Sequence, residues 1–216
     1  MKIYSGPLSM FGAKVEIAAH EKAITFDLEM VPFNMRTLYD PKHPEVLRIN
    51  PKRQVPVLID GTVELFDSTQ IFEYLEDGWP APALWPSAAQ DRAQARLLEL
   101  KSDEVFFPHV IRLMGLRGAG EHPDAGPSRD GIEGFYRDMD RLLEDREYLA
   151  GSYSYADIAF FMAQFFAARM AVPMPVSLSH LLAWRGRVAR RPAVRRVIDP
   201  MVDFLRQAGR PVPAFD

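Results

Sequence analysis

The chain has 216 residues, of which 48% are hydrophobic and 25% charged, and its formal net charge is −3. This composition is that of an ordinary globular protein and excludes a disordered or low-complexity chain. The chain contains no cysteine, which excludes disulfides, thiolate metal ligands and cysteine nucleophiles. We expect no membrane span, no signal peptide and no general attraction to nucleic acid. The lack of cysteine is compatible with a reducing cytosol, and we expect a cytoplasmic protein.

The first eighty residues alternate short strand patterns with helical ones. The predicted strands span residues 2–4, 24–31, 55–59 and 63–66, and the predicted helices span 11–22, 44–49 and 68–75. Asp60-Gly61 is a typical two-residue hairpin turn between the last two strands. The resulting order, βαβ followed by αββα, indicates an α/β domain over residues 1–80.

The composition changes after residue 78, where three prolines and two tryptophans lie within ten residues. This mixture is typical of a linker between domains, which we place at residues 81–87. The remainder, residues 88–216, is predicted to be all-helical. Its helices are expected at 88–116 with a bend at Pro108, and at 129–148, 155–170, 178–190 and 193–207.

A proline near the start of a predicted strand is unusual, because proline cannot donate a hydrogen bond to a sheet. The strand follows Asn50-Pro51-Lys52-Arg53-Gln54-Val55-Pro56. One resolution is a cis Val55–Pro56 bond in a tight turn, which would leave the backbone groups of Val55 facing outward. An extended peptide could then pair with Val55 as an added strand.

A second polar motif, Asp67-Ser68, lies at the start of the helix expected at residue 68. We predict Ser68 as the N-cap of that helix. The first amides of the helix and the Ser68 hydroxyl could hold an α-carboxylate, and Asp67 could pair with an α-ammonium group. A simple helix cap without a ligand is the alternative.

Together these motifs resemble the N-terminal domain of the cytosolic glutathione transferases, in which an N-P-x-x-x-V-P-x-L stretch is followed by an acid–Ser pair. The linker and the helical second half are also similar to that family, so the resemblance covers nearly the whole chain. It implies the glutathione transferase fold, an α/β thioredoxin-like domain followed by an all-α domain. It further implies glutathione as co-substrate, a small electrophile as second substrate, and a homodimer.

The resemblance also implies roles for individual residues. Pro7-Leu8-Ser9 matches the serine-type members of the family, so Ser9 is expected to activate the thiol of glutathione. Tyr4, as in tyrosine-type members, and Ser5 remain alternatives. The glutathione-binding residues would be Gln54, Val55, Asp67 and Ser68, with Pro56 in a structural role.

The second substrate is expected to contact apolar residues of two helices. They are Met10, Phe11, Phe106, Phe107, Val110 and Met114. Met and Phe residues at helical spacing more often form a core than a pocket, which is the alternative for this set.

Ser154 and Asp157 have the spacing of a capping box at the start of the helix at 155, with Asp in place of the commoner Glu. We assign both residues a structural role. His43 precedes the helix at 44, where some relatives contact glutathione, and a solvated loop residue is the alternative. None of the histidines has the spacing of metal ligands, so we expect no metal.

The expected reaction is attack of the glutathione thiolate on a small apolar electrophile. Two alternatives stay open: a glutathione-dependent isomerase or dehalogenase of the same fold, and a non-catalytic interaction module.

Overall fold

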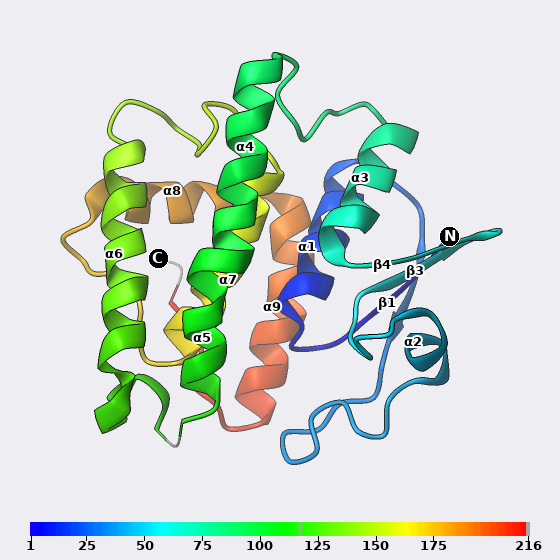
Figure 1. Ribbon diagram of the computed structural model, residues 1–216, viewed down its shortest axis with the longest axis horizontal. Helices are drawn as coiled ribbons and strands as arrows, with labels where there is room; N and C mark the ends of the chain where they lie inside the picture. Colours follow the sequence, from blue (N-terminus) through cyan, green and yellow to red (C-terminus); the bar gives the residue numbers. More distant parts are fainter. Residues whose placement is uncertain (117, 215–216) are drawn as a thin grey trace. The chain divides into compact units, whose positions relative to one another are not determined.

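In the computed structural model, which describes residues 1–116 and 118–214, four short strands form one mixed sheet (Figure 1). They are β1 (Lys2–Ser5), β2 (Asp27–Met30), β3 (Val57–Asp60) and β4 (Val63–Phe66), in the order β2-β1-β3-β4. β1 is parallel to β2 and antiparallel to β3, which in turn is antiparallel to β4. β3 begins two residues later than expected, because Pro56 cannot donate to the ladder.

Helices pack on both faces of the sheet. α1 (Met10–Glu21) and α3 (Ser68–Gly78) share one apolar cluster with Ile3. α2 (Pro44–Ile49) contributes to a second cluster, which contains Tyr4. Because side chains alternate along a strand, neighbouring residues of β1 face opposite sides of the sheet. The result is the thioredoxin-like α/β domain expected from the sequence.

The chain divides into two compact units, and the last helix, α9 (Pro192–Gln207), belongs to the first. This unit contains Met1–Ala83 and Pro192–Arg210, and α9 packs along α1 within it. The second unit begins at Leu84. From the sequence, this helix is expected in the all-helical domain instead. The apolar stripe of a helix predicts that it packs on a core, but not on which one.

Lys22, directly after α1, ties the start of the linker to the first unit. Its ammonium group lies 2.6 Å from a carboxylate oxygen of Glu76. It also donates hydrogen bonds to the carbonyl oxygens of Trp79 at 2.6 Å and of Pro82 at 2.9 Å. A buried cation needs such partners, because an uncompensated charge in the interior is strongly destabilising.

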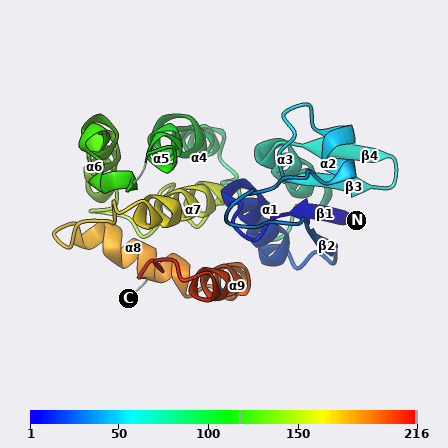
Figure 2. The same cartoon turned by 90° about the horizontal axis from the view of Figure 1, so that it is seen from below.

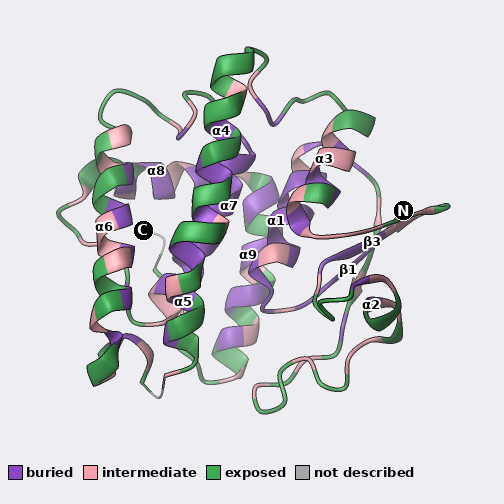
Figure 3. Cartoon of the chain, in the orientation of Figure 1, coloured by how far each residue is buried: buried purple, intermediate pink, exposed green. Residues whose placement is uncertain are grey.

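The described secondary-structure elements of the second unit are all helices or helical turns. Its elements are α4 (Ala89–Lys101), the π-helical turn η1 (Ser102–Phe106), α5 (Phe107–Met114), the short 3₁₀ turns η2 (Ala119–Glu121) and η3 (Pro123–Ala125), α6 (Gly126–Leu142), α7 (Tyr155–Arg169) and α8 (Ser179–Ala189). Figure 2 shows α7 between α4 and α5 on one side and α8 on the other. α7 is buried along almost its whole length, whereas α4 and α6 carry exposed residues on their outward faces (Figure 3).

The helix expected at 88–116 is interrupted before Pro108 rather than at it, by the π-helical turn η1. The ring of a proline clashes with the carbonyl group four residues earlier, here that of Glu104. The preceding turn widens to a π-helix, and Pro108 then occupies the first turn of α5, where a missing N–H costs little. Among the described residues, no helix combines the length and the hydropathy needed to cross a membrane.

The start of α7 is fixed by the predicted capping box, in which the fully buried Asp157 is the acceptor. One carboxylate oxygen accepts from the Leu149 N–H at 3.0 Å and from the Trp184 indole at 2.8 Å. The other accepts from the N–H of Ser154 at 2.9 Å and from its hydroxyl at 3.2 Å. Burial raises the pKa of Asp157 to about 6, although these hydrogen bonds lower it.

A buried side-chain contact joins β1 to α1. The hydroxyl of Ser5, at the end of β1, donates to a carboxylate oxygen of Glu16 on α1. Ser5 is 0% and Glu16 3% exposed. Burial raises the pKa of Glu16 to about 7, and the Ser5 hydrogen bond opposes that shift. The contact therefore keeps a carboxyl group buried inside the domain, and the pKa of this group lies close to neutral pH.

Replacing Asp157 with Ala is expected to destabilise the protein by about 3 kcal/mol or more, because several buried donors lose their acceptor at about 1–3 kcal/mol each. Ser154→Ala removes only the cap and should cost about 1 kcal/mol. Urea unfolding measures both free energies. Equal losses in the two variants would contradict the central role of Asp157.

The Glu16 carboxyl is expected to make the protein less stable as the pH rises from about 4.5 to about 7. In this interval the folded state binds more protons than the unfolded state, because the pKa rises from 4.5 to about 7 on folding. The free energy of unfolding should fall by about 3 kcal/mol relative to Glu16→Gln, whose amide does not titrate. Urea titrations of both proteins across this pH range measure the difference, and parallel curves would contradict the expectation.

Candidate functional site

The register of the sheet brings the predicted site segments to one end of the first unit. Val57 of β3 pairs with Phe66 of β4 and with Tyr4 of β1, both antiparallel. The residues that precede β3 therefore lie at the same end as those that follow β1 and β4. These are the segments that carry Val55, Ser9 and the Asp67-Ser68 pair.

Ser9 is the N-cap of α1 and is buried. Its side-chain oxygen accepts from the Gly12 N–H at 3.0 Å. Its own N–H donates to the Gly6 carbonyl at 3.1 Å, and its carbonyl accepts from the Ala13 N–H at 3.0 Å. Among the described residues the Ser9 hydroxyl donates to no partner, so its proton is available at the positive end of the α1 dipole.

The two alternative hydroxyl groups are placed differently. Tyr4 is buried in the apolar cluster that contains Val46 of α2, on the face of the sheet opposite α1. The Ser5 hydroxyl lies on the face of the sheet that α1 covers, but it donates its hydrogen bond to Glu16. Of the three hydroxyl groups considered from the sequence, Ser9 is the one at the N-terminus of α1 with an uncommitted proton.

The Val55–Pro56 bond is cis, as predicted from the sequence. Val55 is half-buried and Gln54 is exposed. Within the part of the chain that the structure describes, neither the N–H nor the carbonyl of Val55 has a hydrogen-bonding partner. The backbone at Val55 can therefore accept an extended peptide as an added strand.

Asn50, which ends α2, shapes the turn before Val55. Its side-chain amide donates to the Gln54 carbonyl at 2.6 Å, and its side-chain oxygen accepts from the Lys52 N–H at 2.9 Å. Asn50 is 3% exposed. A buried side chain thus sets the peptide plane between Gln54 and Val55. Asn50 lies within the predicted motif, but its sequence pattern alone indicates no role for it.

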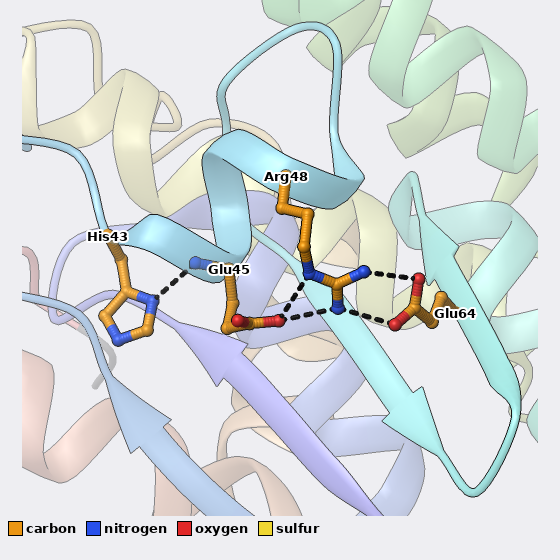
Figure 4. Close-up of polar contacts among 4 residues, drawn as sticks. All are labelled: His43, Glu45, Arg48 and Glu64. Atoms are coloured by element: carbon orange, nitrogen blue, oxygen red, sulfur yellow. Dashed lines mark hydrogen bonds and ion pairs between the residues drawn. The ribbon is translucent and has the colours of Figure 1, made fainter.

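Arg48 fixes α2 against β4 (Figure 4). Its guanidinium contacts Glu45 of the same helix at 2.6 Å and Glu64 of β4 at 2.5 Å and 2.8 Å. The contact with Arg48 lowers the pKa of the Glu64 carboxyl. His43 is the N-cap of α2 and accepts from the Glu45 N–H at 3.2 Å through Nδ1, so it has a capping role.

The N-cap of α3 differs from the prediction by one residue, because Asp67 and not Ser68 caps the helix, which begins at Ser68 as expected. The Asp67 carboxylate accepts from the Thr69 N–H at 3.1 Å and from the Gln70 N–H at 3.4 Å. Asp67 has a φ of 76°, a conformation that costs a residue other than glycine about 1–3 kcal/mol. Ser68 is buried in the first turn of the helix. Serine is a frequent N-cap, which is why the sequence pattern favours Ser68.

The six residues expected to contact the second substrate are placed unevenly. Phe106 is fully buried and packs on Phe135, Tyr136 and Phe160, so in this structure it is a core residue of the second unit. Met114 is 50% exposed. Met10, Phe107 and Val110 are buried and Phe11 is half-buried. Their role toward a substrate stays a prediction.

No group of three or more His, Asp or Glu residues within the described ranges is arranged to hold a metal ion. The expectation that the protein needs no metal stays a prediction.

Comparison with known proteins places the chain in a family. The family model described as "Glutathione S-transferase, N-terminal domain" matches residues 8–77. The probable glutathione S-transferase parC of Nicotiana tabacum is 31% identical over 196 residues, which cover 87% of this chain and 84% of that protein. A stringent starvation protein A homolog of Coxiella burnetii is 34% identical over 116 residues, about half of each protein.

A solved structure agrees with the sequence matches. The glutathione S-transferase from Rhodospirillum rubrum F11 superposes with a TM-score of 0.78 at 25% identity, over 91% of this chain and 90% of that one. The similarity to the tobacco protein extends over most of both chains. The chain therefore belongs to the glutathione S-transferase family.

Proposed function

We propose that this glutathione transferase uses Ser9 to activate glutathione as a thiolate, which attacks a small apolar electrophile. The observation that carries the proposal is the Ser9 hydroxyl. It accepts from the Gly12 N–H and has no acceptor for its own proton among the described residues. A hydroxyl in that state can donate to a sulfur atom placed at the start of α1.

Thiol acidity decides the rate of such a reaction. A free thiol has a pKa near 8.5, so about a few per cent is thiolate at neutral pH. A hydroxyl that donates to the sulfur favours the charged form, and the positive end of α1 adds to the effect. Each unit by which the pKa falls corresponds to about 1.4 kcal/mol of preference for the thiolate.

For glutathione itself we propose an extended position along Val55. The N–H and carbonyl of Val55 would pair with the backbone of the cysteinyl residue, with Gln54 near the glycyl end. The γ-glutamyl end would lie at the start of α3, with its ammonium group on Asp67 and its carboxylate on the first amides and the Ser68 hydroxyl. The register of β3 with β4 supports this arrangement, because it puts Val55 and Ser68 at the same end of the sheet.

Ser9→Ala is expected to reduce the turnover of a chromogenic aryl halide at neutral pH about tenfold for each unit by which the thiol pKa rises. The KM for glutathione should change little, and raising the pH should restore part of the rate. Ser9→Gly, which keeps most of the capping stability, should behave alike. Tyr4→Phe should have little effect. A silent Ser9→Ala with an inactive Tyr4→Phe would assign the activation to Tyr4.

Asp67→Ala is expected to weaken glutathione binding by about 2–5 kcal/mol, because the ammonium group loses its partner. The thiol pKa of glutathione that does bind should change little. Asp67→Asn is the matched control, since asparagine caps a helix as well as aspartate but carries no charge. It should fold normally and bind weakly. Calorimetric titration measures the affinities, and a normal affinity in both variants would place the ammonium group elsewhere.

We also propose a homodimer, since two-fold pairs are the commonest oligomers. Large exposed apolar side chains on α4, η1 and α5 support an interface there. They are Leu97, Leu100, Val105, Ile111 and Met114. Sedimentation at micromolar concentration should give twice the 24.5 kDa of the chain, and a species of the monomer mass would refute the dimer. A cytoplasmic location, where glutathione keeps thiols reduced, stays a prediction.

A non-catalytic interaction module is the second candidate function. One relative, which shares about half its length with this chain, is named a stringent starvation protein A homolog and not a transferase, so the alternative is tested here as well. Immobilised glutathione separates the two candidates. Retention on the resin and elution by free glutathione support the transferase, and lack of retention supports the interaction module.

A further inference from the structure

The Ser5–Glu16 contact has no part in the chemistry proposed above, yet it lies directly beside Ser9. A side chain at Gly12 would overlap the Ser5 hydroxyl oxygen and would lie 3.1 Å from that of Ser9. Both hydroxyl groups therefore lie close to the Cα atom of Gly12, in the first turn of α1. Glycine is required at this position by the space that the hydroxyl groups occupy, since the φ angle of Gly12 is not positive.

The contact also fixes both ends of the loop that carries Ser9. Ser5 ends β1, where its carbonyl accepts from the Val31 N–H at 2.8 Å. Its side chain reaches across to Glu16, in the second turn of α1. Only three residues separate Ser5 from Ser9. A side-chain tether from the strand to the helix thus sets where the N-terminus of α1, and with it Ser9, lies relative to the sheet.

The tether also gives the two hydroxyl groups different roles. Ser5 donates a hydrogen bond to Glu16, whereas the Ser9 hydroxyl donates to no residue that the structure describes. Without Glu16, the fully buried Ser5 hydroxyl would need another acceptor, because an unsatisfied buried donor is costly. A reoriented Ser5 would disturb the first turn of α1 at Gly12, next to the Ser9 oxygen.

We infer that Glu16 is a positioning residue for thiol activation, which through Ser5 holds the first turn of α1 in place and so keeps the Ser9 hydroxyl directed at the glutathione sulfur. The inference rests on the proposed function of Ser9. Both protonation states of Glu16 can serve, because the acid and the carboxylate each offer an oxygen acceptor to Ser5. An amide oxygen would serve as well.

The test is the kinetic pKa of enzyme-bound glutathione, obtained from the pH dependence of kcat/KM with a chromogenic aryl halide and from thiolate absorbance. Glu16→Leu is expected to raise this pKa by about one unit, which lowers kcat about tenfold at pH values below the pKa. The KM for glutathione should stay within about twofold, because the residues proposed to bind it are untouched. Glu16→Gln should restore the wild-type pKa.

Ser5→Ala is the second variant and a smaller change, which guards against loss of folding in Glu16→Leu. It breaks the same tether, so it should raise the pKa by itself, and Glu16→Leu in the Ser5→Ala background should cause no further rise. Ser102→Ala is the matched control for stability. Ser102 is a buried serine of the second unit whose hydroxyl donates to the Leu98 carbonyl at 3.0 Å. Its loss should lower stability without moving the pKa.

The outcomes separate this inference from the proposed function. A pKa that moves in Ser9→Ala but in neither Glu16→Leu nor Ser5→Ala would overturn the role of Glu16 and leave that of Ser9 intact. A Glu16→Gln variant with the pKa of Glu16→Leu would also overturn it. A pKa that does not respond to Ser9→Ala would overturn both, because there would be no activating hydroxyl to position.

Discussion

The antiparallel register of β3 with β1 and β4 is the constraint on which the site depends. It brings the end of β1, the start of β3 and the end of β4 to the same end of the sheet. Two helices, α1 and α3, begin directly beyond this end. A slip of one residue would turn every side chain of a strand to the other face and would separate Ser5 from α1.

Helix N-termini supply most of the polar groups of the site, and the caps are used in different ways. At α7, the oxygens of Asp157 accept four hydrogen bonds and the residue is fully buried, so this cap has a structural role. At α3, Asp67 caps the helix and remains half-buried at a strained φ. At α1, the Ser9 oxygen is used by the helix, while its proton is not. A hydroxyl can therefore cap a helix and still donate, whereas a carboxylate only accepts.

The two buried acids show how the surroundings set the ionisation of similar groups. Burial raises the pKa of both Glu16 and Asp157, because a low dielectric disfavours charge. Asp157 accepts from backbone, hydroxyl and indole donors, and its pKa is about 6. For Glu16, the hydrogen bond that opposes the shift comes from Ser5 alone, and its pKa is about 7. In both acids the effect of burial outweighs that of the hydrogen bonds, so the pKa shifts upward.

The sequence by itself determined the elements and the motifs. The hydrophobic periods placed most of the helices and strands, Asp60-Gly61 placed the hairpin, and Val55-Pro56 indicated the cis bond, because these signals come from neighbouring residues. The tertiary structure alone decided which groups meet. Nothing in the local pattern around Glu16 distinguishes an exposed glutamate from one that contacts Ser5, eleven residues away. The same holds for α9, whose apolar stripe could have packed on either unit, and for Phe106, whose place in an aromatic core depends on α6 and α7. Such contacts depend on how elements that are distant in the sequence pack together. The spacing of apolar residues shows which face of a helix is buried, but it does not show which element packs against that face.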